Sequence, residues 1–134
     1  MRRDSKARLR TGLRADATRV TLRPGAGAST YGIVRRDDGA VIGEMECRRS
    51  DPARGWLSVG FIALAEGERG WGYGSEAVRL LEAEAKGERF LARVDARNGL
   101  GLYFWLRLGY RPARPGEVPG GAQSGIISMV RTRT

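Results

Sequence analysis

The sequence has 134 residues, 41% of them hydrophobic, and a formal net charge of +9; this length and composition predict one domain with a single core. It contains neither an apolar run of roughly 18 residues, as a membrane-spanning helix needs, nor the apolar segment of a secretory signal. The absence of histidine excludes histidine bases and most zinc sites, and the single cysteine, Cys47, cannot form an internal disulfide and suits a reducing cytoplasm.

Residues 1–17 are basic and show little hydrophobic periodicity, so we expect a flexible N-terminal arm. Residues 1–23 hold eight basic and two acidic residues and so account for +6 of the net charge of +9. Because the charge lies mostly on this arm and not on a domain face, it argues against a nucleic-acid-binding protein. An arm that binds an acidic partner stays an alternative.

From residue 18 onward the hydrophobic pattern alternates, as is typical of strands. A strand ending at Pro24 is followed by a short loop, and an Asp-Gly pair at Asp38 and Gly39 indicates a hairpin. A further strand is expected to carry Leu57, Val59 and Phe61 on one face. The four predicted strands are residues 18–24, 31–36, 41–48 and 55–64.

The period then changes to helical spacing. From Ser75 to Lys86, one helical face carries Ala77, Val78, Leu80, Leu81 and Ala85. Gly87 is the expected stop of this helix. A strand at residues 89–94 follows, with Phe90, Ala92 and Val94 on one face.

Asn98 is a suitable N-cap for a second helix, which we expect to run to about Leu108 and to end at Gly109. A short strand that begins at Tyr110, before Pro112, and a last strand at 126–130 complete the pattern. The predicted fold class is α+β, with a mixed, mostly antiparallel central sheet and a strand–helix–strand–helix core. We expect residues 18–134 to form one domain.

Three alternate glycines, Gly70, Gly72 and Gly74, stand where the first helix begins. The first N–H groups of a helix have no intrahelical partner, the helix dipole adds positive charge there, and glycine lets a ligand approach the backbone. The pattern therefore predicts a phosphate or pyrophosphate site, although a purely structural turn is an alternative.

Two familiar phosphate motifs fit poorly. A Walker loop requires Gly-Lys-Ser/Thr, which the sequence lacks. A dinucleotide fingerprint is nearly met from Gly70 to Ser75, and Asp95 follows about 20 residues later, but antiparallel strands precede the turn and too little chain follows for a doubly wound sheet.

The stretch RGWGYG, Arg69–Gly74, resembles the R/Q-x-x-G-x-G/A signature of the GNAT superfamily of N-acetyltransferases. Residues 98–112, NGLGLYFWLRLGYRP, are similar to the Asn-led helix of that superfamily, which ends in L-G-F/Y-x-P, and the strand at 56–64 is also similar. The resemblance covers roughly residues 18–131. It implies a GNAT-like acyltransferase fold, acetyl-CoA as co-substrate and an amine as acetyl acceptor.

The resemblance also implies the residues that bind acetyl-CoA. The backbone of Ile62, Ala63 and Leu64 is expected to pair with the pantetheine arm, and Asn98 to lie near it. Arg69 is expected to shape or contact the turn. The N–H groups expected to hold the pyrophosphate are those of Gly70, Trp71, Gly72, Tyr73, Gly74 and Ser75. Many family members carry Lys or Arg where this chain has Trp71, which supplies no charge and could lie over the adenine or ribose.

The catalytic residues are less clear. Many family members have a tyrosine acid four residues before the Leu-Gly glycine, where this chain has Trp105, which we interpret as pocket wall or core. Tyr103 lies two residues away, about 200° around a helix, and is a weak candidate for the acid. Candidates for a general base are Glu44, Glu46 and Glu66, although each could be an ordinary exposed carboxylate.

The family usually places one or two helices between its first two strands, and only residues 24–30 are available here. Either the acceptor groove is open, or the N-terminal arm or a second subunit covers it. An open groove would favour a protein or peptide amine as the acceptor. That groove, with an exposed final strand, is compatible with a homodimer. The main alternative to an N-acetyltransferase is a non-catalytic coenzyme A-binding sensor or regulatory module, because Trp105 and the missing helices could impair catalysis.

Overall fold

Seven strands form one mixed sheet in the order β1–β2–β3–β4–β5–β7–β6 in the computed structural model, which describes residues 18–85 and 89–133. The strands are β1 (Val20–Pro24), β2 (Thr30–Arg35), β3 (Val41–Arg49), β4 (Trp56–Leu64), β5 (Arg89–Asp95), β6 (Arg111–Pro112) and β7 (Ile126–Thr132). The helices of the described residues are α2 (Tyr73–Glu84) and α3 (Gly99–Arg107). The predicted α+β class is confirmed. The predicted arm at residues 1–17 and the predicted stop at Gly87 lie outside the described residues.

Contacts between residues divide the described chain into two compact units. Unit 1 contains β1, β2, β3 as far as Glu46, the end of β4 from Ile62, and α2. Unit 2 contains the end of β3 from Cys47, β4 as far as Phe61, and β5, α3, β6 and β7. The expectation of one domain over residues 18–134 stays a prediction.

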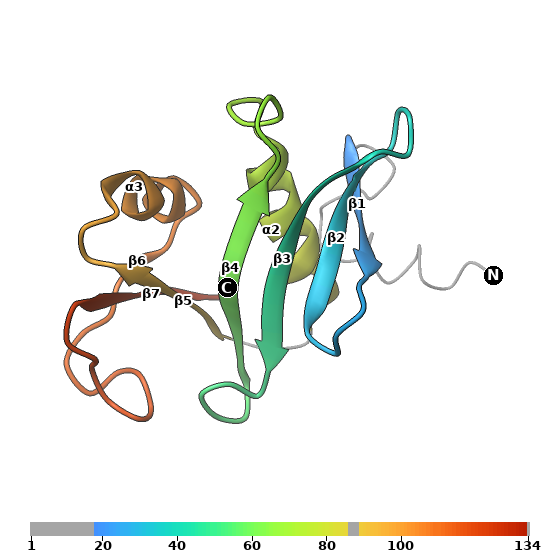
Figure 1. Cartoon of the computed structure of the whole chain (residues 1–134). Helices are drawn as coiled ribbons and strands as arrows, with labels where there is room; N and C mark the ends of the chain where they lie inside the picture. Colours follow the sequence, from blue (N-terminus) through green and yellow to red (C-terminus); the bar gives the residue numbers. More distant parts are fainter. Residues whose placement is uncertain (1–17, 86–88, 134) are drawn as a thin grey trace. The chain divides into compact units, whose positions relative to one another are not determined.

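In unit 1 the first three strands form an antiparallel meander, and α2 lies against one face of it (Figure 1). The loop between Pro24 and Thr30 is short and is closed by a hydrogen bond from the Gly25 N–H to the Thr30 carbonyl, at 2.7 Å. No helix lies in this described segment, as predicted. Core residues from three strands, Val20, Ile33 and Met45, have no exposed surface.

Helix α2 buries the predicted apolar face, since Ala77, Val78, Leu80 and Leu81 are all buried. It begins at Tyr73, two residues before the predicted Ser75. Gly72 adopts a left-handed conformation and serves as the N-cap, so the helical backbone starts within the glycine run and not after it.

In unit 2, β4 and β5 pair in parallel from Trp56↔Arg89 to Val59↔Ala92. Strand β5 also pairs with β7 in antiparallel register along its whole length. One hydrophobic cluster consists of Trp56, Leu91, Val118 and Val130, with two partly buried alanines, Ala53 and Ala113, packed against it.

Phe61 is 43% exposed, because β4 is buried on both faces over its first four residues and emerges towards its end. Two predictions about strands need correction. The last strand, β7, is not at the margin of the sheet, because β6 pairs beside it through Arg111↔Val130 and Pro112↔Met129. Tyr110 is buried and precedes the short strand, which starts at Arg111.

The loop that carries Val118 is held in place by an ion pair between Arg111 and Glu117. Arg111 donates to both carboxylate oxygens of Glu117, at 2.9 and 2.5 Å, and the Arg114 N–H donates to the same carboxylate at 2.8 Å. These hydrogen bonds, led by those from Arg111, lower the pKa of Glu117 from 4.5 to about 2.

We therefore expect Glu117→Gln to lower the melting temperature at pH 7 by a few degrees. Because the pKa of Glu117 is lower in the folded chain, its stabilisation is present above the ordinary value of 4.5 and is lost as the pH falls through about 2. Melting curves followed by circular dichroism should therefore converge for variant and wild type across that interval. Asp37→Asn, in an exposed turn, is the control and should change little; a difference for Glu117→Gln that does not depend on pH would contradict the assignment.

Candidate functional site

The connection between β4 and α2 contains three glycines in a conformation that other residues rarely adopt, Gly67 at a φ of +92° and two glycines of the predicted motif. Gly70 has a φ of +83° and Gly72 a φ of +87°. A Cβ on Gly70 would meet no atom within 4 Å, so its requirement for glycine is one of backbone conformation and not of space. At Gly72 the backbone conformation likewise favours glycine, and a Cβ there would lie 3.2 Å from Nη2 of Arg19, so that side chain would have to shift slightly.

The N-terminus of α2 has no side-chain cap. The N-cap is Gly72, and the first intrahelical bond runs from the Glu76 N–H to the Gly72 carbonyl, at 3.1 Å. The N–H groups of Tyr73, Gly74 and Ser75 therefore have no intrahelical acceptor. With the positive end of the helix dipole, they form a site suited to an anion, which is the chemistry that the glycine pattern predicts.

The turn itself is organised by three hydrogen bonds to backbone carbonyls. The Glu68 N–H donates to Ala65 at 3.0 Å, Nε of Arg69 donates to Leu64 at 3.2 Å, and the indole N–H of Trp71 donates to Gly67 at 3.3 Å. Arg69 thus contacts the backbone at the start of the turn, and its part in coenzyme binding stays a prediction. The Trp71 side chain is 62% exposed, which leaves its ring available to a ligand.

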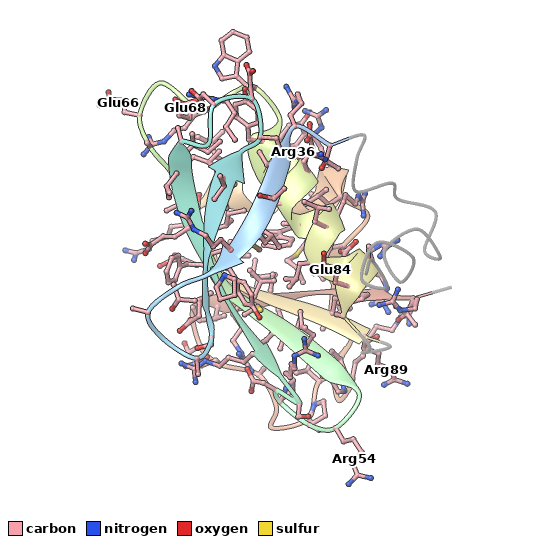
Figure 2. The ribbon with its side chains drawn as sticks, turned by 90° about the vertical axis from the view of Figure 1, so that its right-hand side faces the viewer. Arg36, Arg54, Glu66, Glu68, Glu84 and Arg89 are labelled. Atoms are coloured by element: carbon pink, nitrogen blue, oxygen red, sulfur yellow. The ribbon has the colours of Figure 1, made fainter. Side chains whose placement is uncertain are left out.

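Arg35, the last residue of β2, holds the β4–α2 turn in place. Its Nη1 donates to Glu68 at 2.6 Å, while Nε and Nη2 donate to the two carboxylate oxygens of Asp38 at 3.0 and 2.9 Å. These contacts raise the pKa of Arg35 and lower the pKa of Asp38 to about 2, the hydrogen bond between the two being the largest cause. Figure 2 shows Glu66, Glu68 and Arg36 at one end of unit 1, with Glu66 at the outer edge of the loop.

Arg19, just before β1, contacts the start of α2. It donates to the Trp71 carbonyl at 2.8 Å and forms an ion pair with Glu76, the acidic residue in the first turn of the helix. Sequence reasoning missed both Arg19 and Arg35, because arginines that interact with residues more than 30 positions away leave no local pattern.

The strand before the turn, which is predicted to pair with pantetheine, is packed closely against β3. A Cβ on Gly43 would lie 2.4 Å from the Ala63 carbonyl oxygen and 3.1 Å from the Leu64 Cα, so glycine is required there for space. Ile62 and Leu64 are half-buried and Ala63 is exposed. Gly43 was also missed, although a lone glycine inside a strand pattern is the signal of such a close approach.

Asn98 belongs to unit 2 and caps α3, as predicted. Its Oδ1 accepts a hydrogen bond from the Gly101 N–H at 2.9 Å. A Cβ on residue 101 would meet Nδ2 of Asn98 at 2.4 Å, so Gly101 makes room for the cap. The expected position of Asn98 near pantetheine stays a prediction.

None of the four candidate catalytic residues is fully buried. Glu44 is exposed and Glu46 half-buried, two residues apart on β3, and Glu66 is exposed on the loop. Tyr103 is 58% exposed, with the guanidinium carbon of Arg107 at 5.7 Å from its ring centroid. Their catalytic roles stay predictions.

Trp105 lies in the core of unit 2. It is buried and makes edge-on ring contacts with Phe104 and Tyr110, at centroid distances of 5.1 and 4.7 Å. This position agrees with one of the two interpretations made from the sequence, that of a core residue. The Trp105 ring is held in place by this packing. Its indole N–H is far too weak an acid to protonate a departing thiolate.

The structure brings the predicted turn and strand residues together in unit 1, from Ile62 to Ser75, whereas Asn98 and Tyr103 belong to unit 2. No helix in the described part of the chain is long and apolar enough to cross a membrane. Within the same residues, no cluster of three or more Cys, Asp and Glu side chains could hold a metal ion.

Comparison with known proteins identifies a family model, described as the acetyltransferase (GNAT) family, that matches residues 6–110. This match covers both the β4–α2 turn and the Asn98 helix. The sequence has no match among curated proteins.

Solved structures with the same fold include an acetyltransferase from Thermus thermophilus, with a TM-score of 0.63 and 18% identity over 80% of this chain and 66% of that one. The PaiA N-acetyltransferase from Thermoplasma acidophilum, solved with coenzyme A, has a TM-score of 0.62 and 15% identity over 77% and 59%. The NatC complex bound to Gag peptide and CoA has a TM-score of 0.58 and 19% identity over 78% and 71%. The chain thus spans about two thirds of the length of these proteins, and such low identities establish the fold alone.

The approach of β3 to the end of β4 predicts the effect of a single methyl group. Gly43→Ala forces that methyl group against the Ala63 carbonyl, so we expect a destabilisation of about 1–3 kcal/mol. Gly32→Ala in the same hairpin is the matched control, because its Cβ would meet Val41 at an ordinary 3.7 Å. Urea denaturation measures both variants; equal stability of the two would contradict the close approach.

Proposed function

Because the chain belongs to the acetyltransferase (GNAT) family, we propose that it is an N-acetyltransferase that moves an acetyl group from acetyl-CoA to a primary amine. The observation that carries the proposal is the glycine turn before α2. There Gly70 and Gly72 have positive φ, and three helical N–H groups lack an intrahelical acceptor. This arrangement suits the pyrophosphate of coenzyme A.

In this proposal the backbone does most of the coenzyme binding. The N–H groups from Gly70 to Ser75 hold the pyrophosphate, while Ile62, Ala63 and Leu64 pair with the pantetheine arm as an added strand would. Trp71 carries no charge and so cannot replace a phosphate-binding cation. Its exposed ring instead covers the adenine or ribose of the coenzyme.

The chemistry is direct transfer without a covalent enzyme intermediate. The lone pair of a neutral amine attacks the thioester carbonyl carbon, the C–N bond forms, and the C–S bond breaks with departure of the thiolate. A base removes the proton that the amine nitrogen must lose, directly or through water; Glu44, Glu46 and Glu66 are the candidates. A thiol has a pKa of about 8.5, so the thiolate can leave without an acid, and Tyr103 is only a weak candidate for one.

The acceptor in this proposal is a protein or peptide amine. The short loop between Pro24 and Thr30 contains no helix that could wall off a small acceptor, which favours a large one. The NatC complex, whose solved structure includes a Gag peptide and CoA, has the same fold. Cytoplasmic localisation fits this proposal, since a single cysteine, Cys47, suits a reducing compartment. A homodimer, in which a second subunit covers the groove, fits it as well.

One observation favours a second candidate, a coenzyme A-binding sensor or regulatory module that does not catalyse. Trp105 stands where many family members have a tyrosine acid, and it is buried between Phe104 and Tyr110. Such a module would bind the coenzyme through the same turn but would release no thiol with any amine.

The turn predicts a specific loss of coenzyme binding. Gly72→Glu adds a negative charge and a strained backbone at the anion site, so we expect calorimetry to give an acetyl-CoA affinity at least about tenfold weaker, a loss of about 1.4 kcal/mol or more. Gly39→Glu is the matched control, because Gly39 also has positive φ, +74°, but lies in the β2–β3 hairpin. Failure of the wild type to bind acetyl-CoA at millimolar concentration would rule out the proposal.

Turnover separates the two candidate functions. A panel of small amines, lysine peptides and peptides with free N-termini, assayed by thiol release from acetyl-CoA, should give activity with at least one peptide, and Gly72→Glu should remove it. Binding without thiol release across the whole panel would favour the sensor. Better turnover of small amines than of peptides would contradict the proposed acceptor class.

A further inference from the structure

Arg19 is held over the start of α2 from several directions. Its backbone N–H donates to Oε1 of Glu76 at 2.8 Å, its Nε donates to Oε2 of the same carboxylate at 2.5 Å, and its Nη2 donates to the Trp71 carbonyl at 2.8 Å. The guanidinium carbon lies 4.6 Å from the centroid of the Tyr73 ring. The guanidinium is therefore fixed in position before any ligand binds.

The same guanidinium lies next to the glycine on which the proposed pyrophosphate site depends. Nη2 is 3.2 Å from the position that a Cβ on Gly72 would occupy. The side chain of Arg19 is 48% exposed, and its Nη1 has no hydrogen-bond partner within residues 18–85 and 89–133. Among the described residues, Nη1 is therefore the nitrogen of this guanidinium that can donate to a ligand.

The charges around the start of α2 also favour a cation beside the proposed pyrophosphate site. Glu76 places a carboxylate in the first turn of α2, and this carboxylate would repel a pyrophosphate at the N–H groups of Tyr73, Gly74 and Ser75. Trp71 within the turn supplies no positive charge. Because Arg19 is paired with Glu76 and remains partly exposed, it offsets this repulsion and can offer a charge-assisted hydrogen bond to a phosphate oxygen.

We propose that Arg19 is a coenzyme-binding residue, which positions the β4–α2 turn through the Trp71 carbonyl and places its guanidinium against the pyrophosphate. This inference rests on the proposed coenzyme A site and adds to it a residue more than 50 positions away in the sequence. Glu76 has two opposing effects on the site. It orients Arg19, and it also places a negative charge near the ligand.

Calorimetry with coenzyme A on the full chain tests the inference. Arg19→Ala should weaken binding by about 10- to 100-fold, as expected for the loss of a hydrogen bond from a charged donor, and should reduce the salt dependence of the dissociation constant. Arg23→Ala is the matched control: it removes the same charge from exposed β1 and should change the affinity less than about twofold. Dephospho-coenzyme A, which keeps the pyrophosphate, should show the same loss with Arg19→Ala.

Glu76→Gln keeps the inference testable if Arg19→Ala folds poorly. It removes the negative charge but keeps a side-chain oxygen that can accept from Arg19, which also keeps its contacts with the Trp71 carbonyl and the Tyr73 ring. Arg19 therefore stays oriented, and coenzyme A should bind about two- to threefold more tightly at low salt. If this variant instead weakens binding, Arg19 only holds the turn in place and does not contact the coenzyme, and the inference is wrong. Equal losses for Arg19→Ala and Arg23→Ala, or a loss confined to coenzyme A and absent for dephospho-coenzyme A, would also overturn it. Absence of binding to the wild type would instead reject the proposed function and this inference together.

Discussion

The arrangement of unit 1 around the β4–α2 turn depends on the uncapped N-terminus of α2. Three helical N–H groups have no intrahelical acceptor, and no side chain caps them. Leaving such groups open costs stability, and the chain offsets this with contacts to the surrounding turn and not with a cap. Arg35 holds Glu68, and Arg19 holds the Trp71 carbonyl and Glu76. The donors themselves stay available to a ligand.

Both arginines belong to, or directly precede, the first two strands. The backbone of this hairpin therefore determines where the turn lies, since Arg19 is also fixed by the hydrogen bond from the Arg36 N–H to its carbonyl, at 2.8 Å. A short loop between β1 and β2 suffices for this, as the closure by Gly25 and Thr30 shows. The hairpin with this short connection thus supports the glycine turn before α2.

Close approach of backbones is the second theme of the site. Gly43 lets β3 lie against Ala63 and Leu64, and Gly101 lets the Asn98 side chain fold over the start of α3. Each glycine removes one methyl group whose presence would push apart two neighbouring segments. In unit 2, by contrast, large rings fill the space, as Trp105 shows between Phe104 and Tyr110.

The sequence by itself determined the order and type of the elements, the glycine turn, the Asn98 cap and the short loop after Pro24, because each depends on local pattern or backbone conformation. It also predicted the face of α2 that is buried. Only the tertiary structure decided the partners of Arg19 and Arg35, the need for glycine at 43, and the exposure of Phe61. These depend on contacts between residues far apart in the chain, and on which stretches of a strand are covered on both faces, and no local period encodes either.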